Sequence, residues 1–141
     1  MALGLGRNDK SKVLADVPLF AGLSKKELSQ VASIADELDF RAGKTLIREG
    51  DRGREFFVLL RGGAEVTRGG KQLAVRGAGD FFGEIALITD RPRTATVTTT
   101  EPSVVLVVTD RDFKHLVKES PTIALKVLEA LGERLAWLGS T

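Results

Sequence analysis

FFGEIALITDRPRTATV, residues 81–97, is the most informative stretch of the chain. It opens with a glycine turn at Gly83, continues as a short helical turn and ends in a strand rich in Thr and Val. The first backbone N–H groups of a helical turn are unpaired and carry the positive end of the helix dipole, so such a turn can face an anion. Arg93 follows nine residues after Glu84 and can return its planar fork of donors to the same anion.

Glu84 stands beside this predicted anion site, where its carboxylate would repel a phosphate unless it binds another group. A sugar hydroxyl is a natural partner, because a buried carboxylate without a hydrogen-bond donor is costly. An anion site next to an acceptor for a ribose hydroxyl describes a nucleotide whose phosphate and sugar lie close together. Two alternatives remain: Glu84 caps the adjacent turn through backbone N–H groups, or Arg93 forms a surface ion pair with an acidic residue.

Before this stretch, glycine turns divide the chain into short strands. Ten of the fifteen glycines lie between Gly43 and Gly83, and the glycine pairs at 62–63 and 69–70 suit tight hairpins that need positive φ. The predicted strands share a content of Val, Thr, Phe and Ile and cover residues 45–48, 55–60, 64–68, 72–76, 94–99 and 104–109. Strands this short and evenly spaced indicate an antiparallel β-roll or jelly roll.

A helix is predicted on the N-terminal side of the strands. Ser24 and Glu27 form a Ser-x-x-Glu capping box, which predicts a helix over residues 25–37. Its apolar residues recur at helical spacing: Leu28, Val31, Ile34, Ala35 and Leu38.

Two helices are predicted on the C-terminal side. Asp110 is expected to cap a short helix that contains Phe113, Leu116 and Val117. Ser120 and Pro121 then supply an N-cap and a first-turn proline for a longer helix. The longer helix carries one predicted apolar stripe, made of Ile123, Val127, Leu128, Leu131, Leu135 and Leu138.

Length and composition indicate one domain of the α+β class, mainly β with flanking helices. The chain has 141 residues, of which 43% are hydrophobic and 28% charged, and these values suit a single globular core. We expect an N-terminal tail over residues 1–13 and the domain over residues 14–141, in the order helix, β-roll, two helices.

The composition also excludes several kinds of site. The net charge is 21 − 19 = +2 and the basic residues are scattered, so no nucleic-acid surface is indicated. The chain has no cysteine and one histidine, His115, so thiol chemistry and metal clusters built on thiolate or imidazole are excluded. It lacks an apolar stretch long enough to span a membrane and the apolar core of a signal peptide, so we expect a cytoplasmic protein that does not bind membranes.

The stretch from Gly83 to Leu87, followed by residues 92–97, resembles the phosphate-binding cassette of the cyclic nucleotide-binding domains. This family includes the catabolite activator protein and the regulatory subunits of cAMP-dependent protein kinase. The resemblance extends from about Leu14 to Leu138. It includes Pro18-Leu19-Phe20, Gly50-Asp51, Phe57-Val58 and the segment 110–113.

The resemblance implies a role for each residue of the predicted ligand site. Glu84 would accept from the ribose 2′-OH, Arg93 would pair with the cyclic phosphate, and backbone N–H groups near Ala86 would complete the phosphate site. Gly83 would provide the turn, and the hydroxyl of Thr94 would touch the phosphate or the purine. The predicted ligand-binding set is Gly83, Glu84, Ile85, Ala86, Leu87, Arg93, Thr94 and Ala95, with Leu87 and Val97 as an apolar wall.

Two further residues have alternative predicted roles. In this family a residue of the last helix often covers the purine, so Arg134 or Trp137 is a candidate for base contact. Both are placed off the leucine stripe, and a core or dimer role is the alternative. Phe81 and Phe82 are predicted to be core residues, and His115 is predicted to be solvated.

The resemblance implies a regulatory sensor and no enzymatic activity or cofactor. The expected ligand is cAMP, with cGMP left open because Thr94 would also suit guanine. Binding would shift the C-terminal helices about a hinge at Ser120-Pro121, and the module would act through a protein partner or as a dimer formed by the last helix. The alternatives are a module of the same fold that no longer binds nucleotide, and a metal-dependent enzyme on a β-roll, which would need a cluster of His and Glu ligands.

Overall fold

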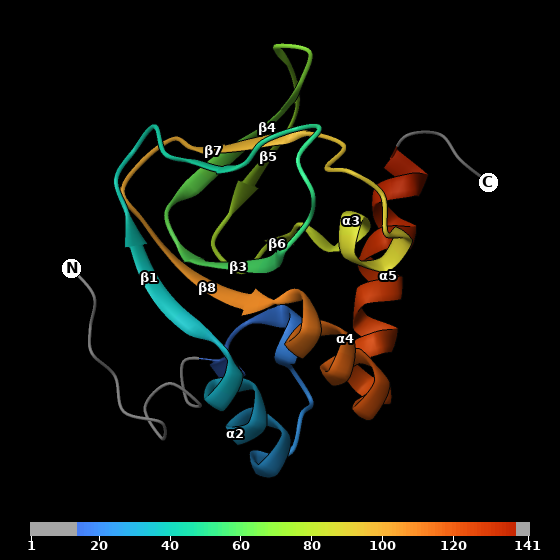
Figure 1. Ribbon diagram of the computed structural model, residues 1–141. Helices are drawn as coiled ribbons and strands as arrows, with labels where there is room; N and C mark the ends of the chain where they lie inside the picture. Colours follow the sequence, from blue (N-terminus) through green and yellow to red (C-terminus); the bar gives the residue numbers. More distant parts are fainter. Residues whose placement is uncertain (1–13, 138–141) are drawn as a thin grey trace.

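A computed structural model describes residues 14–137 of the chain (Figure 1). The predicted N-terminal tail, residues 1–13, lies outside the described residues, as does Leu138 of the predicted stripe. In chain order the elements are η1 (Pro18–Phe20), α2 (Lys25–Ile34), β1 (Asp36–Phe40), β2 (Thr45–Ile47), β3 (Glu55–Arg61), β4 (Gly63–Arg68), β5 (Lys71–Gly77), β6 (Phe81–Phe82), α3 (Glu84–Thr89), β7 (Thr96–Thr99), β8 (Ser103–Thr109), α4 (Asp110–Glu119) and α5 (Pro121–Trp137).

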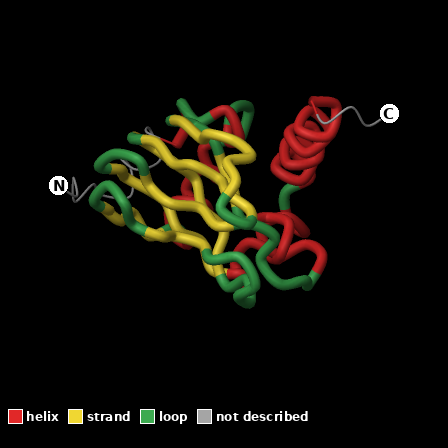
Figure 2. The backbone as a smooth tube through the Cα atoms, turned by 90° about the horizontal axis from the view of Figure 1, so that it is seen from above, coloured by secondary structure: helices red, strands yellow, loops and turns green. Residues whose placement is uncertain are grey.

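The strands form two antiparallel sheets with the helices beside them. One sheet has the order β1-β8-β3-β6 and the other β2-β7-β4-β5. In Figure 2 the strands, in yellow, form one side of the molecule and the long α5, next to the C-terminus, stands at the opposite end, while other helical segments, in red, lie behind the strands. This arrangement confirms the predicted antiparallel roll with one helix before it and two after it.

The apolar run of β3 is explained by the two cores that the strand separates. Phe56 and Val58 pack into a core shared with the helices, whereas Phe57 and Leu59 pack into the core between the two sheets. Successive side chains of a strand point to opposite faces, so a strand buried on both faces reads as a continuous apolar stretch. Phe81 and Phe82 of β6 divide in the same way, and both are buried as predicted.

The β4–β5 connection is the predicted two-residue hairpin. Arg68 pairs with Lys71, and Gly69 and Gly70 between them have φ of 58° and 79°. Positive φ at both central residues matches the twist of the flanking strands and is accessible to glycine at little cost.

The predicted first helix was too long, and the strand after it was missed. The helix ends at Ile34, and β1 then pairs with β8 from Asp36↔Val107 to Phe40↔Ser103. Leu38 fits a helical repeat, but it lies on this edge strand and is 43% exposed. Pairing with the buried β8 therefore overrides the local helical pattern. The two-residue strand β6 was also not predicted, and β7 begins at Thr96, two residues later than expected.

The C-terminal helices differ from the prediction in two details. Thr109, not Asp110, caps α4, because its side chain accepts from the backbone N–H of Asp112 at 3.2 Å. The predicted stripe on α5 divides: Ile123 and Val127 are buried, whereas Leu128 and Leu135 are 63% and 53% exposed. The predicted stripe covers more of the helix circumference than the core contacts, so only part of it is buried.

The junction before α5 follows the prediction and has an additional contact. Ser120 accepts from the backbone N–H of Ile123 at 3.3 Å, as expected of an N-cap. The same hydroxyl donates to Glu27 at 3.0 Å, and Glu27 completes the predicted capping box with Ser24. The start of α2 is therefore tied to the start of α5.

Candidate nucleotide site

One pocket contains every predicted ligand-binding residue except Leu87. It lies where α3 and the loop before β7 meet the inner face of the β2-β7-β4-β5 sheet and α5. Its lining combines apolar and charged side chains: Ile47, Val66, Arg76, Phe82, Gly83, Glu84, Ile85, Ala86, Arg93, Thr94, Ala95, Val97 and Arg134. Leu87 does not line the pocket, because it points into the core with 2% exposure.

Gly83 makes the tight turn that precedes α3. Its φ of 91° lies in the left-handed region, and an added Cβ would lie 3.1 Å from a guanidinium nitrogen of Arg93 and 3.2 Å from the carbonyl oxygen of Glu55. Both the backbone conformation and the close approach therefore require glycine here. No side chain caps α3 at this residue.

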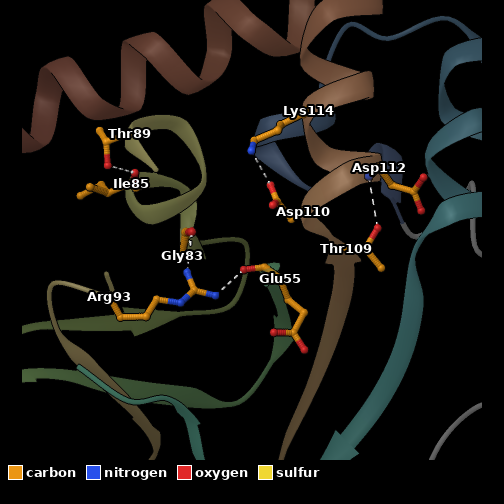
Figure 3. Close-up of polar contacts among 9 residues, drawn as sticks. All are labelled: Glu55, Gly83, Ile85, Thr89, Arg93, Thr109, Asp110, Asp112 and Lys114. Atoms are coloured by element: carbon orange, nitrogen blue, oxygen red, sulfur yellow. Dashed lines mark hydrogen bonds and ion pairs between the residues drawn. The ribbon is translucent and has the colours of Figure 1, made fainter. Parts of the chain in front are cut away.

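Arg93 is a buried cation held by neutral carbonyl groups. Its guanidinium donates to the carbonyl oxygens of Gly83 at 2.7 Å and Glu55 at 2.6 Å, and its side chain lies between these two residues in Figure 3. The residue is 7% exposed, and burial lowers its pKa. Within residues 14–137 no carboxylate makes an ion-pair contact with it. The alternative of a surface ion pair is therefore wrong.

The β2–β3 loop holds Arg93 in place, which the sequence did not reveal. The backbone N–H of Arg93 donates to the backbone carbonyl oxygen of Asp51 at 2.7 Å. The backbone carbonyl oxygen of Arg93 accepts from the backbone N–H of Gly50 at 2.9 Å. A guanidinium carries five N–H donors and the two carbonyl contacts use two of them, so the others remain for an anion.

Gly53 brings the same loop close to α3. A Cβ added at Gly53 would lie 2.8 Å from the Cβ of Ala86, closer than real Cβ atoms approach. The signal in the sequence was the run of small and charged residues between β2 and β3. Gly50-Asp51 within this run belongs to the family resemblance, and the residue types alone do not indicate that the loop positions Arg93.

Glu84 is a buried carboxylate with one charged partner. It is 1% exposed, and its Oε1 accepts from Arg134 at 2.7 Å. Burial raises the pKa of Glu84, although Arg134, a backbone hydrogen bond, Arg76 and Arg93 all act to lower it. A carboxylate held in this way needs donors, and a sugar hydroxyl in the pocket would supply one.

Arg134 reaches the site from α5 and contacts three groups. Besides Glu84, it donates to the carbonyl oxygen of Phe81 at 2.6 Å, and its guanidinium carbon lies 4.6 Å from the centroid of the Phe81 ring. The residue lies on the face of α5 that is turned toward the β-roll. The predicted contact of Arg134 with a base stays a prediction. The side chain of Trp137 lies outside the described residues.

Arg76 is a pocket residue that the sequence did not reveal. It lies on β5, and its Nε is buried with no hydrogen-bond partner. Burial and the nearby charge of Arg134 lower its pKa. Arg76 lies at the end of a predicted strand, and nothing in the sequence around it indicates that its side chain lines a pocket.

The loop before β7 completes the pocket. Thr94 and Ala95 line it, and the carbonyl oxygen of Thr94 accepts from the Nε of Arg68 at 2.8 Å, which ties the loop to the β4–β5 hairpin. Val97 also lines the pocket, and its role as an apolar wall for the base and sugar stays a prediction. Within the described part of the chain, no cluster of three or more His, Cys, Asp or Glu side chains could hold a metal ion.

The family model described as "Cyclic nucleotide-binding domain" matches residues 37–120, which include the two sheets except Asp36 and every pocket residue except Arg134. The chain belongs to this family. The resemblance read from the Gly83 to Val97 cassette is therefore confirmed, and so is the β-roll fold that it implied.

Three comparisons place the chain among its relatives. It is 40% identical over 90 residues to a cAMP-dependent protein kinase regulatory subunit from Mycosarcoma maydis, covering 61% of this chain and 17% of that protein. It is 30% identical over 117 residues to a cGMP-dependent protein kinase from Toxoplasma gondii, covering 83% and 12%. The solved catabolite activator protein of Thermus thermophilus superposes with a TM-score of 0.76 at 27% identity, covering 86% of this chain and 60% of that one.

The chain thus spans less than a fifth of the length of these two curated relatives. In residues 14–137, no helix has the length and apolar character needed to cross a membrane.

Proposed function

We propose that this chain is a sensor domain for a purine 3′,5′-cyclic nucleotide, with cAMP as its ligand. The observation that carries the proposal is Arg93, a guanidinium that is 7% exposed, lines the pocket and has no carboxylate partner in the described residues. A buried cation without a counter-ion is costly unless an anion joins it. A phosphate fits the remaining donors of a planar guanidinium.

Glu84 supports the sugar part of the proposal. Its carboxylate lines the same pocket as Arg93 and is nearly free of water contact, so a ligand hydroxyl is the donor it can gain. Arg93 would bind the cyclic phosphate and Glu84 would accept from the ribose 2′-OH, with backbone N–H groups near Ala86 completing the phosphate site. Val97 and Ile47 would pack against the apolar part of the nucleotide.

The choice of base follows the relatives. The fungal relative is described as a cAMP-dependent regulatory subunit, and the Toxoplasma relative as a cGMP-dependent kinase. Thr94 lines the pocket and offers a hydroxyl that suits either base. cGMP is therefore the second candidate, and the titration below includes it.

The proposed output is regulatory and involves α5. A ligand shifts helices only through its different affinity for two arrangements. Arg134 of α5 already reaches into the pocket, and the junction at Ser120 is where α5 can pivot. The sensor would act in the cytoplasm on a protein partner and would need no cofactor, metal or catalytic group.

We also propose that a second copy of the chain packs on the outer face of α5. Leu125, Leu128 and Leu135 are 57%, 63% and 53% exposed, and with Gly132 they follow each other at steps of three, four and three residues. This spacing is that of the core positions of a two-helix coiled coil, and Gly132 permits close approach. The seam lies on the opposite side of α5 from Ile123 and Val127.

Calorimetric titration with cAMP and cGMP tests the ligand proposal. We expect binding of cAMP, and we expect Arg93→Ala to weaken it by roughly thirtyfold or more, because a charge-assisted contact contributes about 2 kcal/mol. Arg93→Lys keeps the positive charge but loses the planar pair of donors, so its affinity for cAMP should lie between those of the unmodified protein and of Arg93→Ala. Arg111→Ala removes an exposed arginine of α4 and serves as the matched control.

Thermal unfolding of each variant separates loss of binding from loss of fold. No heat with either nucleotide, from folded protein freed of carried-over ligand by refolding, would contradict the proposal. That result would favour a module of this fold that no longer binds nucleotide.

A further inference from the structure

The outward face of α4 carries a row of basic side chains. They recur at steps of three, one and three residues, which places them on one face of a helix: Arg111, Lys114, His115 and Lys118. All four residues are exposed, His115 as predicted, and they line a surface hollow together with Thr109 and Asp112. Phe113 and Leu116 lie on the opposite face of the helix and are buried in the core. The four residues, the α4 basic row, therefore face solvent.

The charge of the α4 basic row is only partly neutralised by the protein. Lys114 pairs with Asp110, one turn earlier, at 3.2 Å, a contact drawn in Figure 3, and its side chain is 44% exposed. An exposed pair of this kind contributes little energy, so Lys114 can exchange it for another partner. Among residues 14–137, no carboxylate forms an ion pair with Arg111 or Lys118. The row therefore presents unpaired positive charge to solvent.

The α4 basic row lies outside the nucleotide pocket, on a helix that packs against elements of it. α4 contacts both α3 and α5, and none of the four basic side chains lines the pocket. The backbone N–H of Asp110 donates to the carbonyl oxygen of Arg54 at 2.7 Å, which places this further exposed arginine at the start of α4. A partner on the row would therefore contact a helix next to α3 and α5 without using the residues that line the pocket.

The carboxylates near the row indicate which kind of anion suits it. Asp110 and Asp112 stand one residue before and one residue after Arg111, each about 100° round the helix, so they flank the row. A nucleic acid carries a negative charge on every phosphate, and its backbone would also meet these two carboxylates. An acidic protein segment can carry its carboxylates at the same steps as the row and place neutral side chains opposite Asp110 and Asp112. Charge complementarity therefore favours an acidic protein segment.

We propose that the α4 basic row is a docking surface for an acidic segment of a protein partner. Arg111 and Lys118 bind carboxylates of the segment, and Lys114 exchanges Asp110 for another of them. The inference goes beyond the proposed function, because it concerns a surface outside the pocket and does not require a bound nucleotide. Attraction between exposed charges is screened by salt, so the affinity of this contact depends on ionic strength.

Fluorescence anisotropy with a labelled peptide tests the proposal on the full chain without nucleotide. The peptide repeats the sequence Glu-Ala-Ala-Glu, so that its glutamates recur at the same steps as the row. We expect saturable binding that weakens as the NaCl concentration rises, and no binding of the same peptide with Gln in place of Glu. The double variant Arg111→Gln, Lys118→Gln should weaken binding by roughly fourfold or more, because two ion pairs with the peptide are lost.

The double variant Arg41→Gln, Lys44→Gln is the matched control, because it removes the same two side-chain types from an exposed turn. That turn follows β1, whose Phe40 pairs with Ser103 at the start of β8, whereas α4 begins after the end of β8. The control should leave peptide binding within about twofold of the unmodified protein, because its charges lie away from the row. Thermal unfolding should show that both double variants remain folded, since every substituted side chain is exposed.

Three results would overturn the proposal. The first is failure of the Glu peptide to bind, and the second is an equal loss of binding in both double variants, which would reflect net charge and not the row. The third is a different occupant of the row. Duplex DNA or phosphatidylserine vesicles that bind more tightly than the peptide and depend on Arg111 and Lys118 would show one, as would self-association of the chain that Arg111→Gln, Lys118→Gln abolishes.

The proposed function fails by a different result. A chain that binds cAMP but not the acidic peptide would keep the function and lose this inference. A chain that binds the peptide through the α4 basic row but binds neither cyclic nucleotide would lose the function and keep the inference.

Discussion

Arg93 and Glu84 are buried charged residues that can bind a ligand because each keeps hydrogen-bonding groups that the protein does not use. Each is almost completely removed from water, yet Arg93 is held by carbonyl oxygens and Glu84 by a guanidinium from another element. A charge that keeps unused donors or acceptors at a pocket wall gains most from a ligand of complementary chemistry. Together the two side chains suit a ligand that carries a phosphate next to a sugar hydroxyl.

The raised pKa of Glu84 predicts a specific pH dependence of stability. Because burial raises the pKa of this carboxyl in the folded protein, the folded state holds its proton more tightly than the unfolded state. Stability from this group is full below the ordinary carboxyl pKa and falls as pH rises toward the folded value. Arg134, Arg76 and Arg93 face the carboxylate and limit the effect without reversing it.

Glu84→Gln should remove this pH dependence. The difference in unfolding free energy between the variant and the unmodified protein should shift in favour of the variant as pH rises above the ordinary carboxyl pKa of 4.5. Urea denaturation at a series of pH values measures it, with Glu119→Gln on the surface of α4 as the control. A difference that stays flat, or that moves in favour of the unmodified protein, would show that Glu84 has no raised pKa.

At the level of single residues, the predicted ligand-binding residues that are close in the sequence come together in the structure, and their binding of a ligand stays a prediction. The residues from Gly83 to Ala86 and from Arg93 to Ala95 are close in sequence and meet in one pocket. Leu87 was misplaced because consecutive residues of a short helix face different sides, and α3 turns Leu87 into the core. The place of Arg76 in the pocket could not be predicted from the sequence, because it depends on how β5 packs against Arg134 of α5.

Among the elements, the β2–β3 loop shapes the site although it supplies no predicted site residue. Its backbone binds the backbone of Arg93 through Gly50 and Asp51, and Gly53 lies against Ala86. The carbonyl oxygen of Glu55, where β3 begins, accepts from the Arg93 guanidinium. These contacts are made by backbone atoms at long sequence separation, so residue type gives little indication of them.

Gly53→Ala should therefore weaken both the fold and the ligand site. A Cβ placed 2.8 Å from the Cβ of Ala86 would push the loop away from α3, which should lower the unfolding free energy by about 1–3 kcal/mol and reduce cAMP affinity. Gly77→Ala is the control, because Gly77 has no positive φ and nothing lies within 4 Å of its added Cβ, and it should change stability by less than about 0.5 kcal/mol. Chemical denaturation and calorimetry report both quantities. Unchanged affinity in Gly53→Ala would show that the loop does not position Arg93.

The junction between α4 and α5 is held by one hydroxyl. Ser120 is 4% exposed, accepts from Ile123 and donates to Glu27 of α2. Ser120→Ala should lower the unfolding free energy by about 1 kcal/mol and speed hydrogen exchange in the first turn of α5, because an N-cap is lost. Ser33→Ala on the exposed side of α2 should change stability by less than about 0.5 kcal/mol. Equal effects in the two variants would show that the junction is not held by Ser120.

For the whole molecule, the proposed dimer gives a concentration-dependent prediction. Sedimentation velocity should show the chain changing from monomer to dimer as concentration rises, and Leu128→Glu should keep it monomeric because a charge in the centre of the seam cannot be buried unpaired. Leu73→Glu alters a side chain of β5 that is 50% exposed, and should leave the dimer intact. A monomer at every concentration, or a dimer that survives Leu128→Glu, would contradict the assigned seam.

The overall architecture was predictable because the glycine turns and apolar runs are local signals. Six of the eight strands, both C-terminal helices and the hairpin at Gly69-Gly70 follow from them. What could not be predicted depends on packing between distant segments: β1 became a strand only because β8 offers it a partner, and the α5 stripe divided because only one side meets the core.

The most direct measurement is a crystal structure of the chain with cAMP bound. The account predicts the cyclic phosphate within hydrogen-bond distance of the Arg93 guanidinium and the ribose 2′-OH on Glu84, with Arg134 still paired to that carboxylate. A nucleotide bound with its phosphate away from Arg93, or outside the pocket formed by α3, the β7 loop and α5, would contradict it.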